Sequence, residues 1–308
     1  MVVMSERMVY LNGDFVPESR ATVSILDRGF QGGEGVYDVG RTYGHKAFRL
    51  RRHVDRLFRS LRYTRIEIEE SADRMETIAH DVLERNRLLL GEWDEYALWF
   101  NVSRGVWPWV PTAVRKGRPT VAVYCLPIGF RAFARFYREG ARLMVTSVRR
   151  TPPESLDPRA KVTNKINHLL ADLEAKDRDP DAYPLMLDTQ GNLAESSASN
   201  VMFVSQGVLC TPTSRNIIEG ITRETVFEIA QSMGIPIQES HYTTYDLFVA
   251  DEAFLTSNSL AILPAASVNG RRFPGGAPGP VTTRLMEGWK QLVGVDFVDR
   301  ACRHLESS

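Results

Sequence analysis

Hydrophobic residues recur every three or four positions in four segments of the chain, which is the spacing of one face of an α-helix. In the segment 164–177, for example, Ile166, Leu169 and Leu173 share such a face. The predicted helices cover residues 48–61, 72–86, 164–177 and a stretch that begins near Gly220 and ends at Gly234. Glycine after the last apolar position is a common helix stop.

Apolar runs bounded by turn residues predict the strands. Asn12-Gly13 between two short apolar stretches is a strong hairpin signal. The predicted strands lie within residues 9–16, 96–103, 119–127, 143–148, 184–204 (a hairpin turning near residues 190–191) and 254–256. Helices and strands mix without regular βαβ alternation, and the pattern breaks near residues 128–138. The sequence therefore predicts two α+β domains, residues 1–130 and 139–308, joined by a linker at 131–138.

Composition mainly excludes classes of partner. The chain has 308 residues, of which 43% are hydrophobic and 25% charged, as in globular proteins. Lys+Arg and Asp+Glu cancel at 38 each, so no global field favours nucleic acid or an anionic membrane as a partner. The cysteines, Cys125, Cys210 and Cys302, show neither metal-ligand spacing nor an even disulfide set. We therefore expect a cytoplasmic protein without a metal site.

The candidate chemistry centres on a lysine and a glutamate. Lys161 lies in an extended segment before a predicted helix that Thr163 or Asn164 would cap, which suits an amine nucleophile. Lys165 is the competing lysine, expected one turn into that helix on its solvent face. Glu195, on a predicted strand, is either an exposed carboxylate or a group that keeps a pyridine nitrogen protonated.

Three further segments are suited to binding a phosphate. The amides of Ile221 and Thr222, after Gly220, open a helix whose dipole favours an anion, although such a start is also an ordinary cap. Asn258 follows a strand that ends in small polar residues. Arg56 lies on an otherwise apolar helix face, where it is either a phosphate ligand or a surface arginine whose stem covers apolar neighbours.

In this order along the chain, these residues resemble the fold-type IV pyridoxal-phosphate enzymes, a family that includes branched-chain and D-amino acid aminotransferases, (R)-amine transaminases and aminodeoxychorismate lyase. The resemblance covers residues 10–292 and is most specific in the segments 195–203, 220–223 and 250–256. It implies a two-domain α+β fold with a small N-terminal α/β domain and a larger C-terminal, cofactor-binding domain that contains a pseudo-barrel. It also implies an active site at a homodimer interface.

By this resemblance, the cofactor is pyridoxal 5′-phosphate. Lys161 would be its Schiff-base lysine, and Glu195 would be the partner of its pyridine nitrogen. The phosphate would be held by Arg56, by the Ile221 and Thr222 amides, and by Asn258, at a position where the aminotransferases usually carry threonine.

The subfamily is decided by departures from these patterns. The arginine and histidine with which D-amino acid aminotransferases bind the substrate carboxylate are replaced here by Trp109 and Pro111. Tyr37 and Arg41 match an aromatic residue and an arginine of the branched-chain enzymes. Those enzymes also place Tyr-x-Arg on a pocket strand, where this chain reads Tyr96-Ala-Leu98.

Trp107 and Trp109 would either form an apolar pocket wall or pack their loop onto its own domain. Residues 155–161 and 279–283 look like those of (R)-amine transaminases. The function predicted is therefore transfer of an amino group from an amino acid or amine to a keto acid, like that of a branched-chain aminotransferase or an (R)-amine transaminase. A lyase like aminodeoxychorismate lyase and an inactive binding protein of the same fold are the alternatives.

Overall fold

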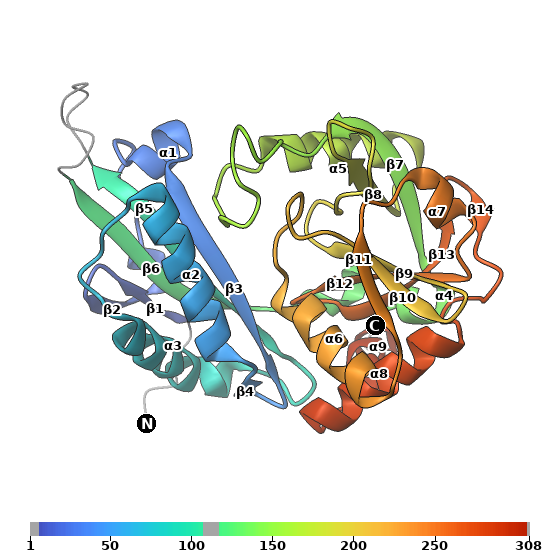
Figure 1. The fold of residues 1–308 in the computed structure, drawn as a ribbon. Coiled ribbons are helices and arrows are strands. Elements are labelled where there is room, and N and C mark those ends of the chain that lie inside the picture. Colours follow the sequence, from blue (N-terminus) through green and yellow to red (C-terminus); the bar gives the residue numbers. More distant parts are fainter. Residues whose placement is uncertain (1–5, 107–116, 307–308) are drawn as a thin grey trace. The chain divides into compact units, whose positions relative to one another are not determined.

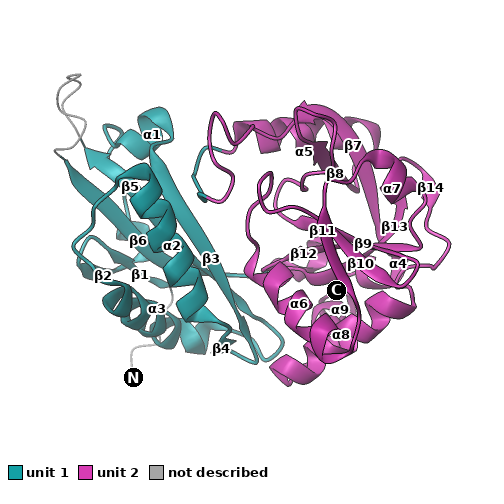
Figure 2. Cartoon of the chain, in the orientation of Figure 1, with its two compact units in different colours: residues 1–128, 160–164 teal, residues 129–159, 165–308 magenta. Residues whose placement is uncertain are grey.

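The chain divides into two units, each with its own sheet (Figure 2). The computed structural model describes residues 6–106 and 117–306. Unit 1 spans Met1–Ile128 and Ala160–Asn164, and unit 2 spans Gly129–Arg159 and Lys165–Ser308. Four residues of the expected linker 131–138 are buried in the core: Phe133, Ala134, Phe136 and Tyr137. The segment that carries Lys161 therefore belongs to the N-terminal unit, although it is flanked in sequence by the C-terminal one.

Unit 1 is built on a six-stranded sheet with the strand order β2-β1-β6-β5-β3-β4 (Figure 1). Its elements are β1 (Met8–Leu11), β2 (Asp14–Pro17), η1 (Glu18–Arg20), α1 (Arg28–Gly32), β3 (Gly35–Tyr43), β4 (Lys46–Ala47), α2 (Leu50–Thr64), α3 (Ala72–Asn86), η2 (Arg87–Leu89), β5 (Tyr96–Val106) and β6 (Arg118–Pro127). The predicted hairpin is confirmed, with Asn12 and Gly13 at positive φ in its turn.

The core of unit 1 lies between this sheet and one pair of helices. Helix α2 packs on β3, and α3 packs on β1 and β6. Leu57 from α2 and Ile78 from α3 are fully buried against Leu98 and Phe100 of β5. Because side chains alternate along a strand, the residues between them, Ala97 and Trp99 among them, lie on the sheet face away from these helices. This second face carries Tyr37 and Arg41 of β3, two of the candidate substrate residues.

Unit 2 is built on an eight-stranded sheet with the strand order β11-β10-β9-β12-β13-β7-β8, in which β14 also pairs with β13. Its elements are η4 (Phe130–Ala132), α4 (Phe136–Glu139), β7 (Ala141–Arg149), α5 (Ile166–Arg178), β8 (Ala182–Leu187), β9 (Asn200–Ser205), β10 (Val208–Pro212), α6 (Ile221–Ser232), β11 (Ile237–Ser240), α7 (Thr244–Phe248), β12 (Glu252–Ser257), β13 (Ala261–Val268), β14 (Arg271–Arg272), α8 (Pro280–Val293) and α9 (Phe297–Glu306). Within the described ranges, no helix is both long enough and apolar enough to cross a bilayer.

The hairpin predicted over residues 184–204 is confirmed only around its turn, where Met186 N donates to Glu195 O at 3.0 Å and Asp188 N donates to Asn192 O at 2.8 Å; its extension to residue 204 is wrong. Strand β8 pairs in parallel with β7, and the chain between them contains α5, so β7, α5 and β8 form a βαβ unit. Strand β9 pairs instead with β10 and β12. Residues 192–195 pair with the end of β8 through backbone hydrogen bonds, and an isolated bridge joins Glu195 to Asn200 at the start of β9. Glu195 therefore lies in a tight bend before β9 and not on a regular strand.

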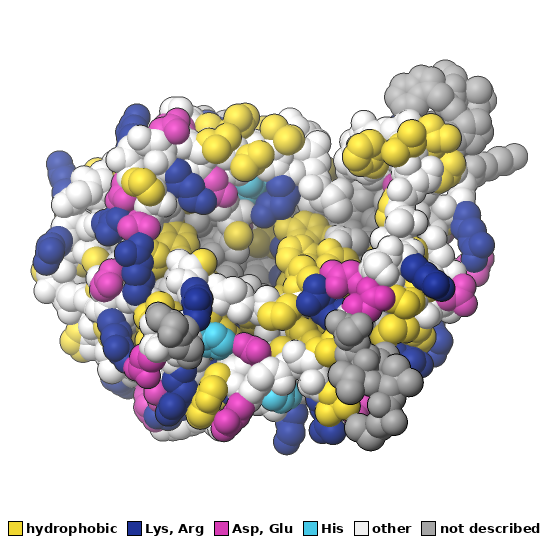
Figure 3. Space-filling model, turned by 180° about the vertical axis from the view of Figure 1, so that it is seen from behind, with side chains coloured by type: hydrophobic (Ala, Val, Ile, Leu, Met, Phe, Trp, Pro, Cys, Tyr) yellow, Lys and Arg dark blue, Asp and Glu magenta, His cyan; other side chains and the backbone are white. Residues whose placement is uncertain are grey.

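Helix α5 presents its apolar side chains outward. Its buried residues, Ala171 and Ala175 among them, let the helix lie close to β7 and β8. The apolar side chains that sequence spacing places on one face are 50–62% exposed; they are Ile166, Leu169, Leu170 and Leu173, and we call them the α5 apolar face. Figure 3 shows hydrophobic side chains at the molecular surface. A face of this kind is typical of a surface that another chain covers.

Candidate active site

Lys161 is held at the edge of β3 by backbone hydrogen bonds. Tyr37 N donates to Lys161 O at 2.9 Å, and Thr163 N donates to Gly35 O at 2.9 Å. The backbone N of Lys161 in turn donates to the hydroxyl of Ser60, a buried residue of α2, at 3.0 Å. The residues around Lys161 thus extend the sheet of unit 1, and this pairing fixes the origin of the lysine side chain.

The side chain of Lys161 lies over an aromatic ring. Its Nζ is 4.3 Å from the centroid of the Tyr37 ring, within the range of a cation–π interaction. The Tyr37 ring stacks on Trp99 of β5, with centroids 6.0 Å apart and planes inclined by 16°. Lys161 and Tyr37, two of the predicted site residues, are therefore neighbours within unit 1.

Arg41 lies farther along β3 and is 2% exposed. Its Nε donates to Thr42 O at 3.0 Å, and its guanidinium carbon is 3.9 Å from the centroid of the Tyr43 ring. These contacts orient the guanidinium along its own strand. Trp107 and Trp109, the other predicted substrate residues, lie outside the described residues.

Arg56 is buried and paired with a carboxylate, so the alternative of a surface arginine is wrong. Its Nε donates to Asp38 Oδ2 at 2.7 Å, and its Nη2 donates to Asp38 Oδ1 at 2.9 Å. His53 Nδ1 lies 2.7 Å from the same Oδ1. We call these three residues the Asp38 cluster; each is at most 6% exposed.

Burial and charge act in opposite directions on the Asp38 cluster. Burial alone would raise the pKa of Asp38, but the Arg56 cation and the bond to His53 bring that pKa well below its usual range. Burial also lowers the pKa of His53, against the attraction of Asp38. The cluster thus combines an ionised aspartate, an arginine cation and a histidine that favours its neutral form.

Glu195 is 3% exposed in unit 2 and receives donors on both carboxylate oxygens. Arg150 Nε donates to Oε1 at 2.7 Å. Asn200 Nδ2 and the backbone N of Ile218 donate to Oε2 at 3.2 and 3.1 Å. We call Arg150, Glu195 and Asn200 the Glu195 cluster; charge-assisted bonds of this kind stabilise a carboxylate anion in the interior.

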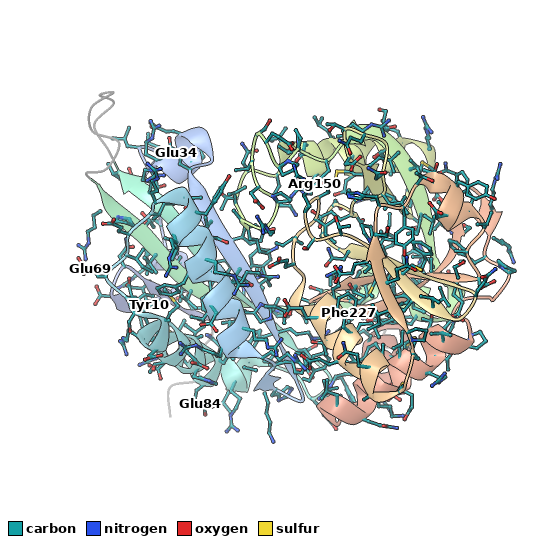
Figure 4. All side chains as sticks on the ribbon, viewed as in Figure 1. Tyr10, Glu34, Glu69, Glu84, Arg150 and Phe227 are labelled. Atoms are coloured by element: carbon teal, nitrogen blue, oxygen red, sulfur yellow. The ribbon has the colours of Figure 1, made fainter. Side chains whose placement is uncertain are left out.

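Arg150, labelled in Figure 4, also reaches the surface of a cavity in unit 2. The cavity has a volume of about 300 Å³, and its lining includes Asp188, Arg215, Asn216 and His241. Small solutes in this cavity can therefore reach Arg150.

The start of α6 fits a phosphate. Gly220 caps this helix without any side-chain hydrogen bond, so the Ile221 and Thr222 amides that follow are directed at the helix end. A Cβ at position 220 would collide with Asn200 Oδ1, so the close approach of the two segments requires glycine. The chain thereby brings a helix N-terminus close to the residue that also binds Glu195.

A second observation supports an anion in this part of unit 2. Thr256 pairs with Asn200 across β12 and β9 and is 1% exposed. Its Oγ1 is buried and finds no hydrogen-bond partner among the described residues. A buried hydroxyl without a hydrogen-bond partner lowers the stability of the fold, and a phosphate oxygen would accept a hydrogen bond from it. Asn258 follows β12 in the next turn, so the residues present fit a phosphorylated pyridine cofactor.

Lys165 serves a different role from the one expected. It is the N-cap residue of α5 and not a residue inside the helix, and the expected side-chain caps from Thr163 or Asn164 are absent. Its Nζ donates to Ser197 O at 2.8 Å within unit 2. Lys165 thus holds the bend that follows Glu195.

Several residues of these clusters were not predicted from the sequence. Asp38, His53, Ser60 and Arg150 are single polar residues without a diagnostic spacing. A buried aspartate in the middle of an apolar strand was the one available signal, because such a residue requires a cationic partner.

Known proteins resemble this chain over most of its length. The sequence profile of the family Amino-transferase class IV matches residues 35–268. A D-alanine aminotransferase of Listeria monocytogenes is 31% identical over 304 residues, which is 97% of this chain and 98% of the relative.

Solved structures show the same similarity. A branched-chain aminotransferase from Thermoproteus uzoniensis, solved with norvaline, superposes with a TM-score of 0.85 at 30% identity over 98% of both chains. A branched-chain amino acid aminotransferase from Thermobaculum terrenum, solved in its PLP form, gives a TM-score of 0.83 at 26% identity over 96% of both chains.

Proposed function

Because this chain belongs to the class IV aminotransferases, we propose that Lys161 and Glu195 are the two residues that carry its transamination chemistry. The family depends on pyridoxal phosphate, and its members transfer amino groups between small molecules. The predictions of a fold-type IV chain, of a transaminase and of its cofactor are thereby confirmed. The single observation that supports the assignment of Lys161 is its fixed position at the edge of β3, with its amine over the Tyr37 ring.

The roles of the residues follow from their surroundings. Lys161 would hold the cofactor through Nζ, and the same amine is placed to move a proton at the Cα of the substrate. Backbone bonds to Tyr37 and Ser60 keep that amine in place. Arg56 is held in a fixed orientation by Asp38 and, by the family resemblance, would bind the phosphate.

Unit 2 supplies the remaining groups. When bound, pyridoxal phosphate accepts the electron pair that remains at the substrate Cα after its proton leaves. Glu195, which accepts hydrogen bonds from three donors, would hold a proton on the pyridine nitrogen. The Ile221 and Thr222 amides, the Thr256 hydroxyl and Asn258 would bind the phosphate.

The two lysines provide the test. In Lys161→Ala, we expect loss of turnover and of covalent cofactor retention after borohydride reduction; in Lys165→Ala, most of both should remain. Mass spectrometry of the reduced protein locates the modified peptide. Modification of Lys165, or loss of retention in Lys165→Ala alone, would reverse the assignment.

We further propose a donor with an apolar side chain, as for a branched-chain amino acid or an (R)-amine. A panel of amino donors of both chiralities, each with pyruvate and with 2-oxoglutarate, tests the proposal. Requirement for a keto acid separates transamination from a lyase reaction. Because Trp109 and Pro111 replace the arginine and histidine of the D-amino acid enzymes, we expect weak or no turnover of D-alanine, and efficient turnover would refute this expectation.

We also propose that the enzyme is a cytoplasmic homodimer in which a second copy covers the α5 apolar face. Four exposed aliphatic side chains on one helix support this proposal. Leu169→Glu with Leu170→Glu should shift the sedimentation coefficient to that of a monomer. The matched control is Leu88→Glu, an exposed leucine on η2, which should not shift it.

A further inference from the structure

The sheet face that carries Tyr37 continues as a row of three aromatic rings. The Tyr37 and Trp99 rings stack as described above, and Trp99 stacks on Tyr124 of β6 with centroids 6.2 Å apart and planes inclined by 2°. We call Tyr37, Trp99 and Tyr124 the aromatic row. With Lys161 Nζ over Tyr37, the row begins at the reactive amine and crosses three strands within unit 1.

The strand register explains why these rings lie together. Trp99 is directly opposite Tyr124 on β6 and opposite Val39 on β3. Tyr37 is opposite Asn101, so Tyr37 reaches Trp99 along a diagonal. Because the side-chain period of a strand is two, all of these residues lie on the face away from α2 and α3.

The Tyr96-Ala-Leu98 segment lies where the branched-chain enzymes carry Tyr-x-Arg on a pocket strand, but its first and third side chains point into the core. Tyr96 and Leu98 are each 1% exposed and belong to the core against the helices. They therefore do not reach the side of the sheet on which Lys161 and Tyr37 meet. Trp99, one position later, is the residue of β5 that does.

The aromatic row is both accessible and rigid. Trp99 and Tyr124 are half-buried, so part of each ring is open on this face of unit 1. Asn101 Nδ2 donates to the Tyr124 hydroxyl at 2.7 Å, which fixes the outer ring. The strand positions beside Trp99 carry small or apolar side chains, among them Val39, Ala97 and Ala122.

We propose that the aromatic row selects amino donors with an aromatic side chain and that Trp99 is the main specificity residue. The inference rests on the proposed function, because it assumes that Lys161 is the reacting amine. A substrate whose Cα lies beside the Lys161 amine would extend its side chain along the row. An aromatic side chain gains binding free energy from offset-stacked or edge-to-face contacts with other rings, in addition to the burial of apolar area. An aliphatic side chain gains binding free energy from the burial of apolar area alone.

Trp99→Leu provides the test, with Phe100→Leu as its matched control. Phe100 is the next residue of β5, is fully buried and faces the helices, so its loss affects the core and not the row. The measurement is the ratio of kcat/KM for phenylalanine to that for leucine, each with 2-oxoglutarate, in the chirality that the donor panel selects. In Trp99→Leu this ratio should fall about tenfold, as expected for the loss of an aromatic contact, and in Phe100→Leu it should stay unchanged.

Binding provides a second measurement that needs no turnover. In Lys161→Ala, calorimetry with 3-phenylpropanoate and with 4-methylpentanoate should show tighter binding of the aromatic acid, and adding Trp99→Leu should remove this preference. Equal ratios in wild type and Trp99→Leu, or tighter binding of the aliphatic acid, would overturn the inference. If no donor of either class is turned over, the proposed function itself fails, so the two failures are distinguishable.

Discussion

Each unit contains a buried arginine–carboxylate pair, but the carboxylates of the two pairs have different hydrogen-bond partners. In the Asp38 cluster, Arg56 bonds both oxygens of the aspartate and His53 adds a third contact. In the Glu195 cluster, Arg150 donates through Nε to one oxygen, and neutral donors occupy the other. One pair satisfies its charges internally, and the other has an arginine that also lines a cavity.

This difference separates a group that supports the site from a group that acts in it. Asp38 has its charge balanced by Arg56, so its first task is to keep that arginine in the interior. Glu195 is stabilised as an anion by Arg150 and two neutral donors, so it can still interact with a protonated nitrogen. We therefore expect changes at Asp38 to affect stability first and changes at Glu195 to affect rate first.

The largest effect is expected for Glu195→Gln. An amide does not hold a proton on the pyridine nitrogen, so turnover should fall by orders of magnitude, at about 1.4 kcal/mol of barrier for each tenfold. The protein should still fold and retain cofactor absorbance, because Arg150, which loses its anionic partner, also lines a cavity that water can enter. Single-turnover kinetics with bound cofactor measure the effect, and a near-normal rate would contradict the role of Glu195.

For Asp38→Asn we expect a loss of stability that precedes any loss of rate. Removing one charge of a buried pair leaves Arg56 uncompensated, which should cost about 3–5 kcal/mol in the free energy of unfolding. Asp55→Asn is the control, because Asp55 pairs with Arg51 on the exposed side of α2 and should cost at most about 1 kcal/mol. Urea denaturation gives both values, and equal losses would show that Asp38 is not the support of Arg56.

A smaller and reversible effect is expected for Arg150→Ala. Loss of its guanidinium removes the cation that bonds Glu195, and about 10- to 100-fold of the rate should be lost with it. Because the arginine lines an open cavity, added guanidinium at low, non-denaturing concentration should restore part of the rate. Arg215→Ala, an exposed arginine of the same cavity, should show neither loss nor rescue, and rescue of both variants would argue against a specific role.

The smallest effect concerns pH and the Asp38 cluster. Burial lowers the pKa of His53 below its ordinary value of 6.5, so the unfolded chain binds a proton there before the folded chain does. The contribution of neutral His53 to the free energy of unfolding is therefore complete above pH 6.5 and is lost as the pH falls below that value. Between about pH 6.5 and 5.5, wild type should lose about 1 kcal/mol more unfolding free energy than His53→Asn, as measured in urea. Parallel curves for the two proteins would exclude His53 as the source.

Local sequence determined those features that depend on neighbouring residues. The apolar spacing of α3 predicts its bounds, 72–86, and the Asn12-Gly13 turn predicts the first hairpin, because helix periodicity and turn chemistry are local properties. The motifs around Lys161, Glu195 and Gly220 likewise identified the family, because their order along the chain carries that information.

Tertiary structure decided which partners those residues have. The predicted hairpin at 184–204 ends near Glu195, because β9 pairs with β10 and β12 and not with β8, which pairs with the sequence-distant β7. Pairing with Asp38 makes Arg56 a buried cation, where the sequence left both a phosphate ligand and a surface arginine open. The register of β5 places Trp99, and not Tyr96, on the sheet face of Tyr37 and Lys161. Burial, ion pairing and strand register depend on contacts between distant segments, so periodicity and spacing do not contain them.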